Sequence, residues 1–266
     1  MTALGLLEGR VAIIAGAGRG IGASLSTVFA QQGAKVVAVD VDSQRAREIS
    51  ESVDASGGTA MGICADLRDP DAVTSIVEQT VASFGAIDAL VNNAGGSFAY
   101  VGRKPITRYT EQDWDDILER NLRYVFLMSR AVVPVMARGD GGTIVNISST
   151  LGIYGSALMV AYGAAKAGVN NLTRSLAVEF GPSGIRVNSL SLGHIEVPAG
   201  KGAPDDGSAS ALPLRRFGSP DEVAQVAAFL ASDLASYVTG ADITLDGGAS
   251  ALNVFTLSHT SALSAG

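Results

Sequence analysis

A short apolar run that passes through three glycines into a helical pattern constrains the fold of this chain more than any other feature. Residues 10–15 predict a buried strand, Gly16, Gly20 and Gly22 follow it, and a helical pattern covers residues 23–32. Glycines at such a junction let the backbone approach a phosphate, because no Cβ stands in the way. The free amides and the positive end of the helix dipole then favour the pyrophosphate of a dinucleotide. A tight turn without a ligand is the alternative interpretation.

Strand and helix signals alternate along the whole chain. Apolar runs predict strands near residues 10–15, 35–40, 60–65, 87–92, 143–149, 185–191 and 242–246. Helical patterns lie near residues 20–32, 43–55, 70–84, 112–137, 159–180 and 220–232, and the last begins with a capping box at Ser219, Pro220 and Glu222. The alternation predicts one doubly wound α/β domain over residues 1–266, with ligands at the carboxyl ends of a parallel sheet.

An acid ends the second predicted strand and bears on the choice of dinucleotide. Asp40 lies eighteen residues beyond Gly22, where a carboxylate accepts hydrogen bonds from both hydroxyls of the adenosine ribose. The same charge repels a 2′-phosphate, so Asp40 favours NAD over NADP. Arg19 opposes this preference, because a guanidinium beside the ribose pairs with a 2′-phosphate. We give Asp40 the greater weight and expect NAD.

A serine, a tyrosine and a lysine form the second candidate site. Ser149 ends a predicted buried strand, Tyr162 follows thirteen residues later, and Lys166 lies one helical turn beyond the tyrosine. Because residues i and i+4 share a helix face, the phenol and the ammonium point into the same space. We expect the cation to lower the pKa of the phenol, which then exchanges a proton with an alcohol or a ketone. Alone, the pair is weak evidence, since an exposed tyrosine and a solvated lysine give the same pattern.

Composition argues against several other classes of function. The chain has a net charge of −7, which disfavours a nucleic-acid partner, and no apolar run is long enough to span a membrane. No secretory signal pattern is present, and the single cysteine, Cys64, lies in a predicted strand. We therefore expect a buried free thiol and a reducing, cytoplasmic location, and we assign no metal site.

Taken together, these motifs closely resemble the short-chain dehydrogenase/reductase family over roughly residues 6–248. The resemblance rests on residues 16–22, Asp66-Leu67, Asn92-Asn93-Ala94-Gly95, Asn121, Ser149, Tyr162 with Lys166, and Asp246-Gly247-Gly248. It implies a single Rossmann domain with a seven-stranded parallel sheet, an NAD(P)-dependent oxidoreductase and a homotetramer. The uncharged residues 223–231 and the tail at residues 249–266 favour pairing through the last helix and strand, with the tail at a subunit boundary.

The resemblance also implies roles for individual residues. Ser149 is expected to polarise the carbonyl, Tyr162 to exchange the proton, and Lys166 to bind the nicotinamide ribose. Asn121 resembles the family's helix-bending asparagine, which is expected to position a water in the proton relay. Asn92 either ties neighbouring strands together or contacts the ligand. Asp66 and Leu67 are expected to flank the adenine. The cofactor-binding residues are then Gly16, Arg19, Gly20, Ile21, Asp40, Val41, Asp66, Leu67, Asn93, Ala94, Gly95, Tyr162, Lys166, Gly193 and Ile195.

The residues after the sixth strand depart from the family's usual Pro-Gly-x-Ile-x-Thr. Leu192 stands in place of the proline, which frees the backbone beside the nicotinamide. Val197 stands in place of the threonine, which removes a hydroxyl that commonly meets the carboxamide. Ala15 replaces another usual threonine, at the expense of a hydrogen bond but not of activity. Residues 196–212, rich in Gly, Pro, Ala and Ser, are expected to form a substrate loop or lid.

The expected substrate pocket is mostly apolar. Its residues are Gly96, Phe98, Leu151, Ile153, Tyr154, Met159, Leu192 and His194, with core packing as the alternative for Ile153 and Met159 and a pocket-wall role for His194. No residue among them is an obvious clamp for an anion. We therefore expect an NAD-dependent alcohol dehydrogenase or ketoreductase acting on a neutral, hydrophobic secondary alcohol or ketone, alicyclic or aryl-alkyl. The alternatives are an NADPH-dependent 3-oxoacyl thioester reductase and a nucleotide-binding regulator without turnover.

Overall fold

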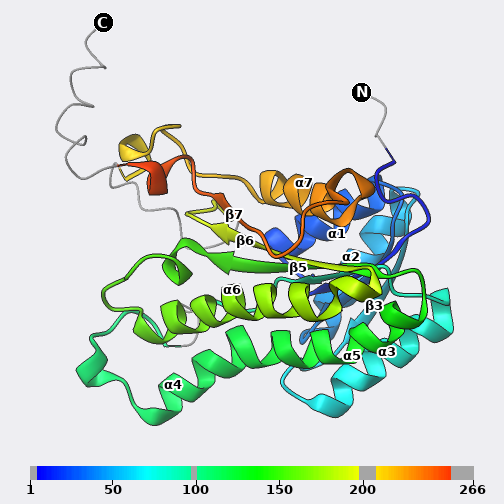
Figure 1. Cartoon of the computed structure of the whole chain (residues 1–266), viewed down its shortest axis with the longest axis horizontal. Coiled ribbons are helices and arrows are strands. Elements are labelled where there is room, and N and C mark those ends of the chain that lie inside the picture. The colour runs from blue at the N-terminus through cyan, green and yellow to red at the C-terminus, as the bar shows by residue number, and fades with distance from the viewer. Residues whose placement is uncertain (1–4, 97–100, 198–207, 253–266) are drawn as a thin grey trace, which may run out of the picture.

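A seven-stranded parallel sheet forms the centre of the molecule. The computed structural model describes residues 5–96, 101–197 and 208–252. The strands lie in the order β3-β2-β1-β4-β5-β6-β7, so the chain starts in the middle of the sheet and winds outward in both directions (Figure 1). They are β1 Val11–Ala15, β2 Lys35–Asp40, β3 Thr59–Cys64, β4 Ala89–Asn92, β5 Gly142–Ser149, β6 Ile185–Leu192 and β7 Asp242–Leu245. The predicted strands and the doubly wound α/β class are confirmed.

Helices cover both faces of the sheet (Figure 1). On one face lie α1 (Ile21–Gln31), α2 (Ser43–Ala55) and α7 (Pro220–Ala231), and on the other lie α3 (Pro70–Phe84), α5 (Tyr124–Arg138) and α6 (Val160–Phe180). Successive side chains of a strand point to opposite faces, so Ile13 packs with the second group and Ile14 with the first. Burial on both faces is why the strands appear in the sequence as continuous apolar runs.

The helix predicted near residues 112–137 is interrupted. The structure has α4 (Glu111–Leu118), a π-helical turn at Glu119–Arg123, and then α5. Inside the turn, the Asn121 side chain donates a hydrogen bond of 2.9 Å to the carbonyl oxygen of Ile117. A π-helical turn of this kind is frequent at functional sites because it bends the helix and shifts the side chains that follow. The apolar pattern continues through the break, so periodicity alone predicts one helix.

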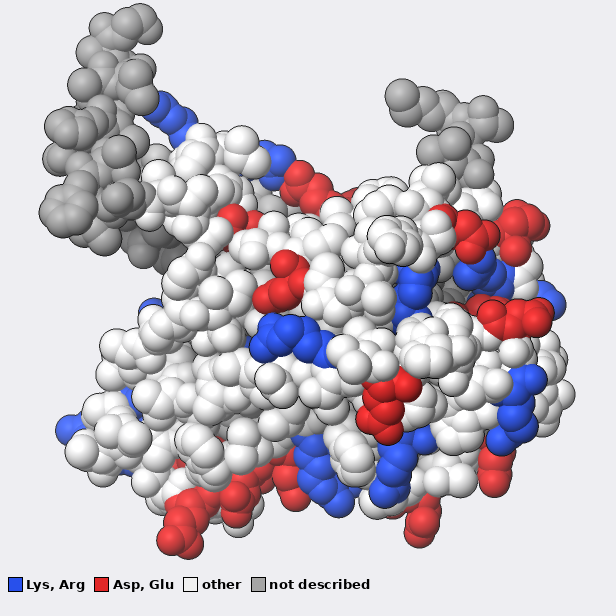
Figure 2. Space-filling view, in the orientation of Figure 1, with Lys and Arg blue, Asp and Glu red and all other residues white. Residues whose placement is uncertain are grey.

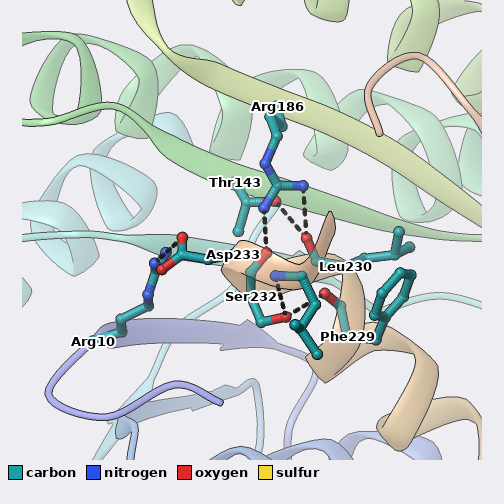
Figure 3. A network of polar contacts seen from close by, with 8 residues as sticks. Arg10, Thr143, Arg186, Phe229, Leu230, Ser232 and Asp233 are labelled. Atoms are coloured by element: carbon teal, nitrogen blue, oxygen red, sulfur yellow. Dashed lines mark hydrogen bonds and ion pairs between the residues drawn. The ribbon is translucent and has the colours of Figure 1, made fainter. Parts of the chain in front are cut away.

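A network of polar contacts lies at the amino end of the sheet (Figure 3). We call it the Arg186 cluster; it comprises Arg10, Thr143, Arg186, Leu230, Ser232 and Asp233. The guanidinium of Arg186 reaches from β6 to the end of α7 and donates to the carbonyl oxygens of Leu230 at 2.8 Å and Ser232 at 3.0 Å. The last carbonyls of a helix have no partner within the helix, so this arginine satisfies them and stabilises the terminus of α7. The capping box predicted at Ser219 closes the other end of the same helix.

The surface expected of the last helix is mostly internal. Residues 223–231 suggested a neutral, apolar face that an isolated subunit would expose. Instead Val223, Ala224, Ala227 and Leu230 are fully buried, in the core between α7, α1 and the sheet of the same chain. The expectation was wrong because the helical period directs those residues inward, while the exposed side of the helix begins with Asp221 and Glu222.

The structure bears on two expectations drawn from composition, a buried Cys64 thiol and the lack of a membrane-spanning segment. Cys64 is exposed rather than buried, because it ends β3, the edge strand of the sheet. Its thiol donates a hydrogen bond of 3.4 Å to the carbonyl oxygen of Val41. The prediction of a buried thiol was therefore wrong. In the described part of the chain, no helix is both long and apolar enough to span a membrane.

Candidate active site

A cavity of about 660 Å³ opens at the carboxyl ends of β1, β2 and β4. The residues predicted to bind a cofactor and found in its lining are Gly16, Arg19, Gly20, Ile21, Asp40, Val41, Asp66, Leu67, Asn93, Ala94 and Gly95. The structure thus brings together residues that are up to 79 positions apart in the sequence. The lining also contains Val197, the departure from the family motif noted in the sequence. It further contains Ala65, Arg45, Arg68, Arg120 and Tyr124, which the sequence motifs did not identify.

The glycine turn after β1 is packed so closely that side chains are excluded. A Cβ on Gly16, whose φ is +84°, would lie 2.6 Å from the Cα of Ala94, and one on Gly22 would lie 1.9 Å from the carbonyl oxygen of Gly16. Asn93 donates a hydrogen bond of 2.8 Å to that oxygen and so ties the loop after β4 to the turn. No side chain caps the start of α1. Free amides at a helix N-terminus beside a narrow cradle fit the phosphates of a dinucleotide.

Asp40 is fixed at one end of the cavity. Its carboxylate is only 9% exposed and accepts hydrogen bonds of 3.0 Å from the backbone amides of Gly18 and Asp42, one to each oxygen. The two amides orient the carboxylate and leave each oxygen with further acceptor capacity for the hydroxyls of a ribose. Arg45 and Asp40 converge on Gly18, since a Cβ there would lie 2.6 Å from an atom of each.

The lining of the cavity is positively charged although the whole chain is acidic. Arg19, Arg45, Arg68 and Arg120 line it together with only two carboxylates, those of Asp40 and Asp66. Arg68 donates to Asp66 at 2.5 to 3.1 Å, and this pairing lowers the pKa of Asp66. A local excess of cations suits the two charges of a pyrophosphate. The arginines lie on four separate segments, which is why no sequence motif marked them as a group.

Val197 forms part of the cavity wall. A Cβ on Gly20 would lie 2.6 Å from a methyl group of Val197, so this valine packs directly over the glycine turn. Gly193 and Ile195, both predicted to bind cofactor, are absent from the lining and instead hold the segment that carries Val197. The amide of Gly193 donates to Leu245 at 2.9 Å, and Ile195 forms a parallel bridge with Gly218.

Ser149, Tyr162 and Lys166 meet at the carboxyl end of β5. Ser149 is the last residue of β5, and the other two lie one turn apart on α6. Burial raises the pKa of Tyr162, and a hydrogen bond with Ser149 offsets part of that rise. The Lys166 ammonium lies 5.6 Å from the centroid of the tyrosine ring and donates a hydrogen bond of 2.8 Å to the carbonyl oxygen of Ile147. Burial lowers the pKa of Lys166 to about 8.

The expected lowering of the tyrosine pKa by the lysine is therefore not what this structure shows. The positions agree with the prediction, since both side chains occupy one face of α6. The pKa of Tyr162 is raised, because removal of the phenolate from water outweighs the hydrogen bond with Ser149, which lowers the pKa. The lysine is itself enclosed by protein, being 3% exposed, and its charged form is disfavoured for the same reason.

Two asparagines stabilise the strands and loops around this centre. The Asn121 side chain accepts from the amide of Gly96 at 2.9 Å and donates to the carbonyl of the same residue at 3.2 Å, which holds the loop after β4. Asn92 donates a hydrogen bond of 2.9 Å to Asn146 on the neighbouring strand. Asn92 is absent from the cavity lining, so its contacts support the strand-tying interpretation.

The residues predicted for the substrate pocket fall into two groups. Met159 and Leu192 are buried, whereas Ile153 and Tyr154 are 44% and 50% exposed, so core packing is wrong for Ile153. Leu151 is partly buried, Gly96 is held by Asn121, and Phe98 lies outside the described residues. The exposed His194 packs against Phe217, an aromatic neighbour that the sequence did not single out, with ring centroids 4.1 Å apart.

Comparisons with known proteins agree with this fold. Residues 16–250 match the family model described as enoyl-(acyl carrier protein) reductase. The chain is 42% identical to the 3-oxoacyl-[acyl-carrier-protein] reductase of Thermotoga maritima, over 91% of this chain and 98% of that protein. It is 39% identical to the cis-4-hydroxycyclohexanecarboxylate dehydrogenase of Sinomonas cyclohexanicum, over 91% of this chain and 97% of that protein.

Among solved structures, a 7α-hydroxysteroid dehydrogenase complexed with NADH and 7-oxo glycochenodeoxycholic acid is similar, with a TM-score of 0.86 and 33% identity. The similarity covers 92% of this chain and 95% of that chain. The fold and these comparisons identify an oxidoreductase of a class that binds a nicotinamide dinucleotide. The chain belongs to the short-chain dehydrogenase/reductase family.

Proposed function

We propose that this protein is an NAD(H)-dependent oxidoreductase that interconverts a neutral, hydrophobic secondary alcohol and its ketone. The observation that carries the proposal is the convergence of Ser149, Tyr162 and Lys166 at the same edge of the sheet as the cofactor cavity. A hydroxyl, a phenol and an ammonium in one place are suited to moving a proton to or from an alcohol oxygen.

Each residue of the cluster has a distinct part in the proposed reaction. A bound nicotinamide supplies or accepts the hydride. Ser149 holds the substrate oxygen, and Tyr162 exchanges a proton with that oxygen through its hydroxyl. Lys166 binds the nicotinamide ribose. Asn121, in the π-helical turn, holds a water that connects the lysine to solvent.

The choice of NAD rests on Asp40. Its oriented carboxylate supports binding of a ribose with two free hydroxyls and repels a 2′-phosphate. Arg19 and Arg45 also line this part of the cavity, but Arg45 is engaged with Asp42 at 3.4 Å. The negative charge is buried while Arg19 is exposed, so Asp40 dominates the local field.

The apolar character of the predicted pocket supports a hydrophobic substrate. Among the residues predicted for this pocket, Leu151, Met159 and Leu192 are aliphatic, and the ring of His194 packs against that of Phe217. Two of the similar proteins bear names that refer to ring alcohols, the cyclohexane derivative and the hydroxysteroid. These names support an alicyclic substrate for this chain.

A 3-oxoacyl thioester reductase with NADPH is the second candidate. The relative at 42% identity carries the name of a 3-oxoacyl-[acyl-carrier-protein] reductase, and arginines are available beside Asp40. A nucleotide-binding regulator without turnover is the third, and the complete Ser149, Tyr162 and Lys166 cluster argues against it.

One spectrophotometric screen distinguishes the three candidates. We expect NAD⁺ to be reduced with alicyclic or aryl-alkyl secondary alcohols, at a kcat/KM well above that with NADP⁺. Oxidation of NADPH by a 3-oxoacyl thioester as the fastest reaction would establish the second candidate instead. Binding of NADH without turnover across the whole panel would leave the regulator.

We also propose a homotetramer. The last strand, β7, forms one edge of the sheet, and Ile243 and Leu245 on it are only partly buried. Figure 2 shows wide uncharged areas between the scattered charges of one face, over α5 and α6. Light scattering should give four times the mass of one chain, and a stable monomer at micromolar concentration would refute the assembly. The tail beyond residue 252 lies outside the described residues, so its part in the assembly stays a prediction from the sequence.

A further inference from the structure

Tyr124 is a second phenol beside the catalytic centre. It is the first residue of α5, directly after the π-helical turn that contains Asn121, and lies three positions beyond that asparagine. Residues three apart on a helix lie on neighbouring parts of one face, so both face the interior of the molecule. Tyr124 is 1% exposed, Asn121 is fully buried, and Tyr124 forms part of the lining of the cofactor cavity.

The hydroxyl of Tyr124 has no hydrogen-bond partner among the described residues. Burying an unpaired hydroxyl is unfavourable, and a phenylalanine would fill the same space without that penalty. Burial raises the pKa of Tyr124, and so does its electrostatic interaction with Tyr162. The polar atom therefore lies at the cavity wall, and no hydrogen bond from the described residues explains its presence there.

We propose that Tyr124 is a positioning residue whose hydroxyl donates a hydrogen bond to the bound dinucleotide. The inference rests on the proposed function only in that a dinucleotide occupies the cavity, and it holds for NAD or NADP alike. A dinucleotide carries ribose hydroxyls, phosphate oxygens and a carboxamide, all of which accept hydrogen bonds from a phenol. The bond satisfies the hydroxyl and holds the cofactor against the part of the cavity wall that α5 supplies.

Tyr109 provides a matched control. Its hydroxyl is also buried without a partner in the described part of the chain, but it is absent from the cavity lining. Tyr124→Phe and Tyr109→Phe therefore make the same chemical change, removal of one buried, unpaired hydroxyl. Only the first removes a group from the cofactor cavity.

The test measures binding of NADH and NADPH by fluorescence, and thermal unfolding with and without each cofactor. We expect Tyr124→Phe to bind the preferred cofactor about five- to tenfold more weakly, as loss of one hydrogen bond predicts. The unfolding temperature without cofactor should stay equal or rise, while the increase caused by cofactor should become smaller. In Tyr109→Phe the unfolding temperature without cofactor should likewise stay equal or rise, and cofactor binding should not change.

The outcomes separate this inference from the proposed function. Unchanged cofactor affinity in Tyr124→Phe, with a wild-type protein that binds NADH, overturns the role of Tyr124 and leaves the function intact. A hydroxyl that is bonded only to water would give this same unchanged affinity, and the role of Tyr124 would be overturned. A wild-type protein that prefers NADPH overturns the assignment of Asp40, whereas a five- to tenfold loss of NADPH binding in Tyr124→Phe would still support the inference. Failure of the wild type to bind either cofactor overturns both.

Discussion

The two ends of the parallel sheet differ in whether their buried polar groups have hydrogen-bond partners. At the amino end, the Arg186 guanidinium bonds the last carbonyls of α7, and no atom of the Arg186 cluster appears among the unpaired buried polar atoms of the described residues. At the carboxyl end, the Tyr124 hydroxyl is buried without a partner. There Lys166 is also enclosed, with a pKa lowered to about 8.

This difference separates polar groups that stabilise the fold from polar groups that are suited to binding a ligand. A saturated network stabilises the folded chain but has no bonding capacity left for another molecule. Unpaired or desolvated groups reduce stability, and they persist where a substrate or cofactor uses them. Substitutions at the amino end should therefore alter stability, and those at the carboxyl end should alter function.

The largest expected effect is on turnover at the carboxyl end. Tyr162→Phe should lose about 10²- to 10⁴-fold in kcat, because the group that exchanges the proton is removed. Binding of NADH should persist, and the unfolding temperature should not fall. Kinetics with the best alcohol of the screen measure the effect, and retention of more than a tenth of the wild-type rate would refute the role of Tyr162.

The second effect is on stability at the amino end. Arg186→Ala should lower the free energy of unfolding by about 2–3 kcal/mol, because the carbonyl oxygens at the end of α7 lose a charged donor. Urea unfolding measures it, and the affinity for NADH should not change. Arg10→Ala is the control, since its partner Asp233 is 88% exposed and such a pair contributes about 0–1 kcal/mol. Equal losses in the two variants would contradict the importance of the buried network.

The third effect concerns cofactor choice. Asp40→Ser should shift the ratio of NAD⁺ to NADP⁺ kcat/KM by about tenfold or more toward NADP⁺, because the charge that repels a 2′-phosphate is gone. Arg19 is then available to pair with the phosphate. If the wild type already prefers NADP⁺, the weight given to Asp40 over Arg19 is wrong.

The smallest effect is a pH dependence of stability caused by Lys166. The folded-state pKa of about 8 is below the ordinary 10.5, so between these values the unfolded chain binds more protons than the folded one. The stability should therefore rise as the pH increases from 8 to 9.5, by roughly 1–1.5 kcal/mol. Below pH 8 the penalty of the buried charge is fully present. The increase should vanish in Lys166→Met, and urea unfolding of both proteins measures it; an equal slope in the variant would assign the effect to other groups.

The sequence predicts the framework well because local patterns carry it. Apolar runs and helical periods locate the strands and helices to within a few residues, and Ser219 forms the predicted capping box. The helix break at Asn121 escapes the pattern, because an extra residue in one turn hardly changes the apolar period. Cys64 escapes it because a strand at an edge and one at the centre have similar compositions.

For the site, the motifs locate the residues but not their environment. Glycines, Asp40, Ser149, Tyr162 and Lys166 are recognisable from type and spacing. The four arginines and Tyr124 come from separate segments, and only folding brings them to one cavity. No spacing rule relates them, because their proximity depends on how α2, α3 and α5 pack.

The sequence alone therefore determined the order of strands and helices, the tight glycine turn after β1, and the three residues to which we assign the proton exchange. Tertiary structure decided which apolar residues of α7 are internal, the positive charge of the cavity, and the raised pKa of Tyr162. The physical reason is that propensity and spacing act over a few residues, whereas burial and electrostatic interaction depend on every segment packed around a group.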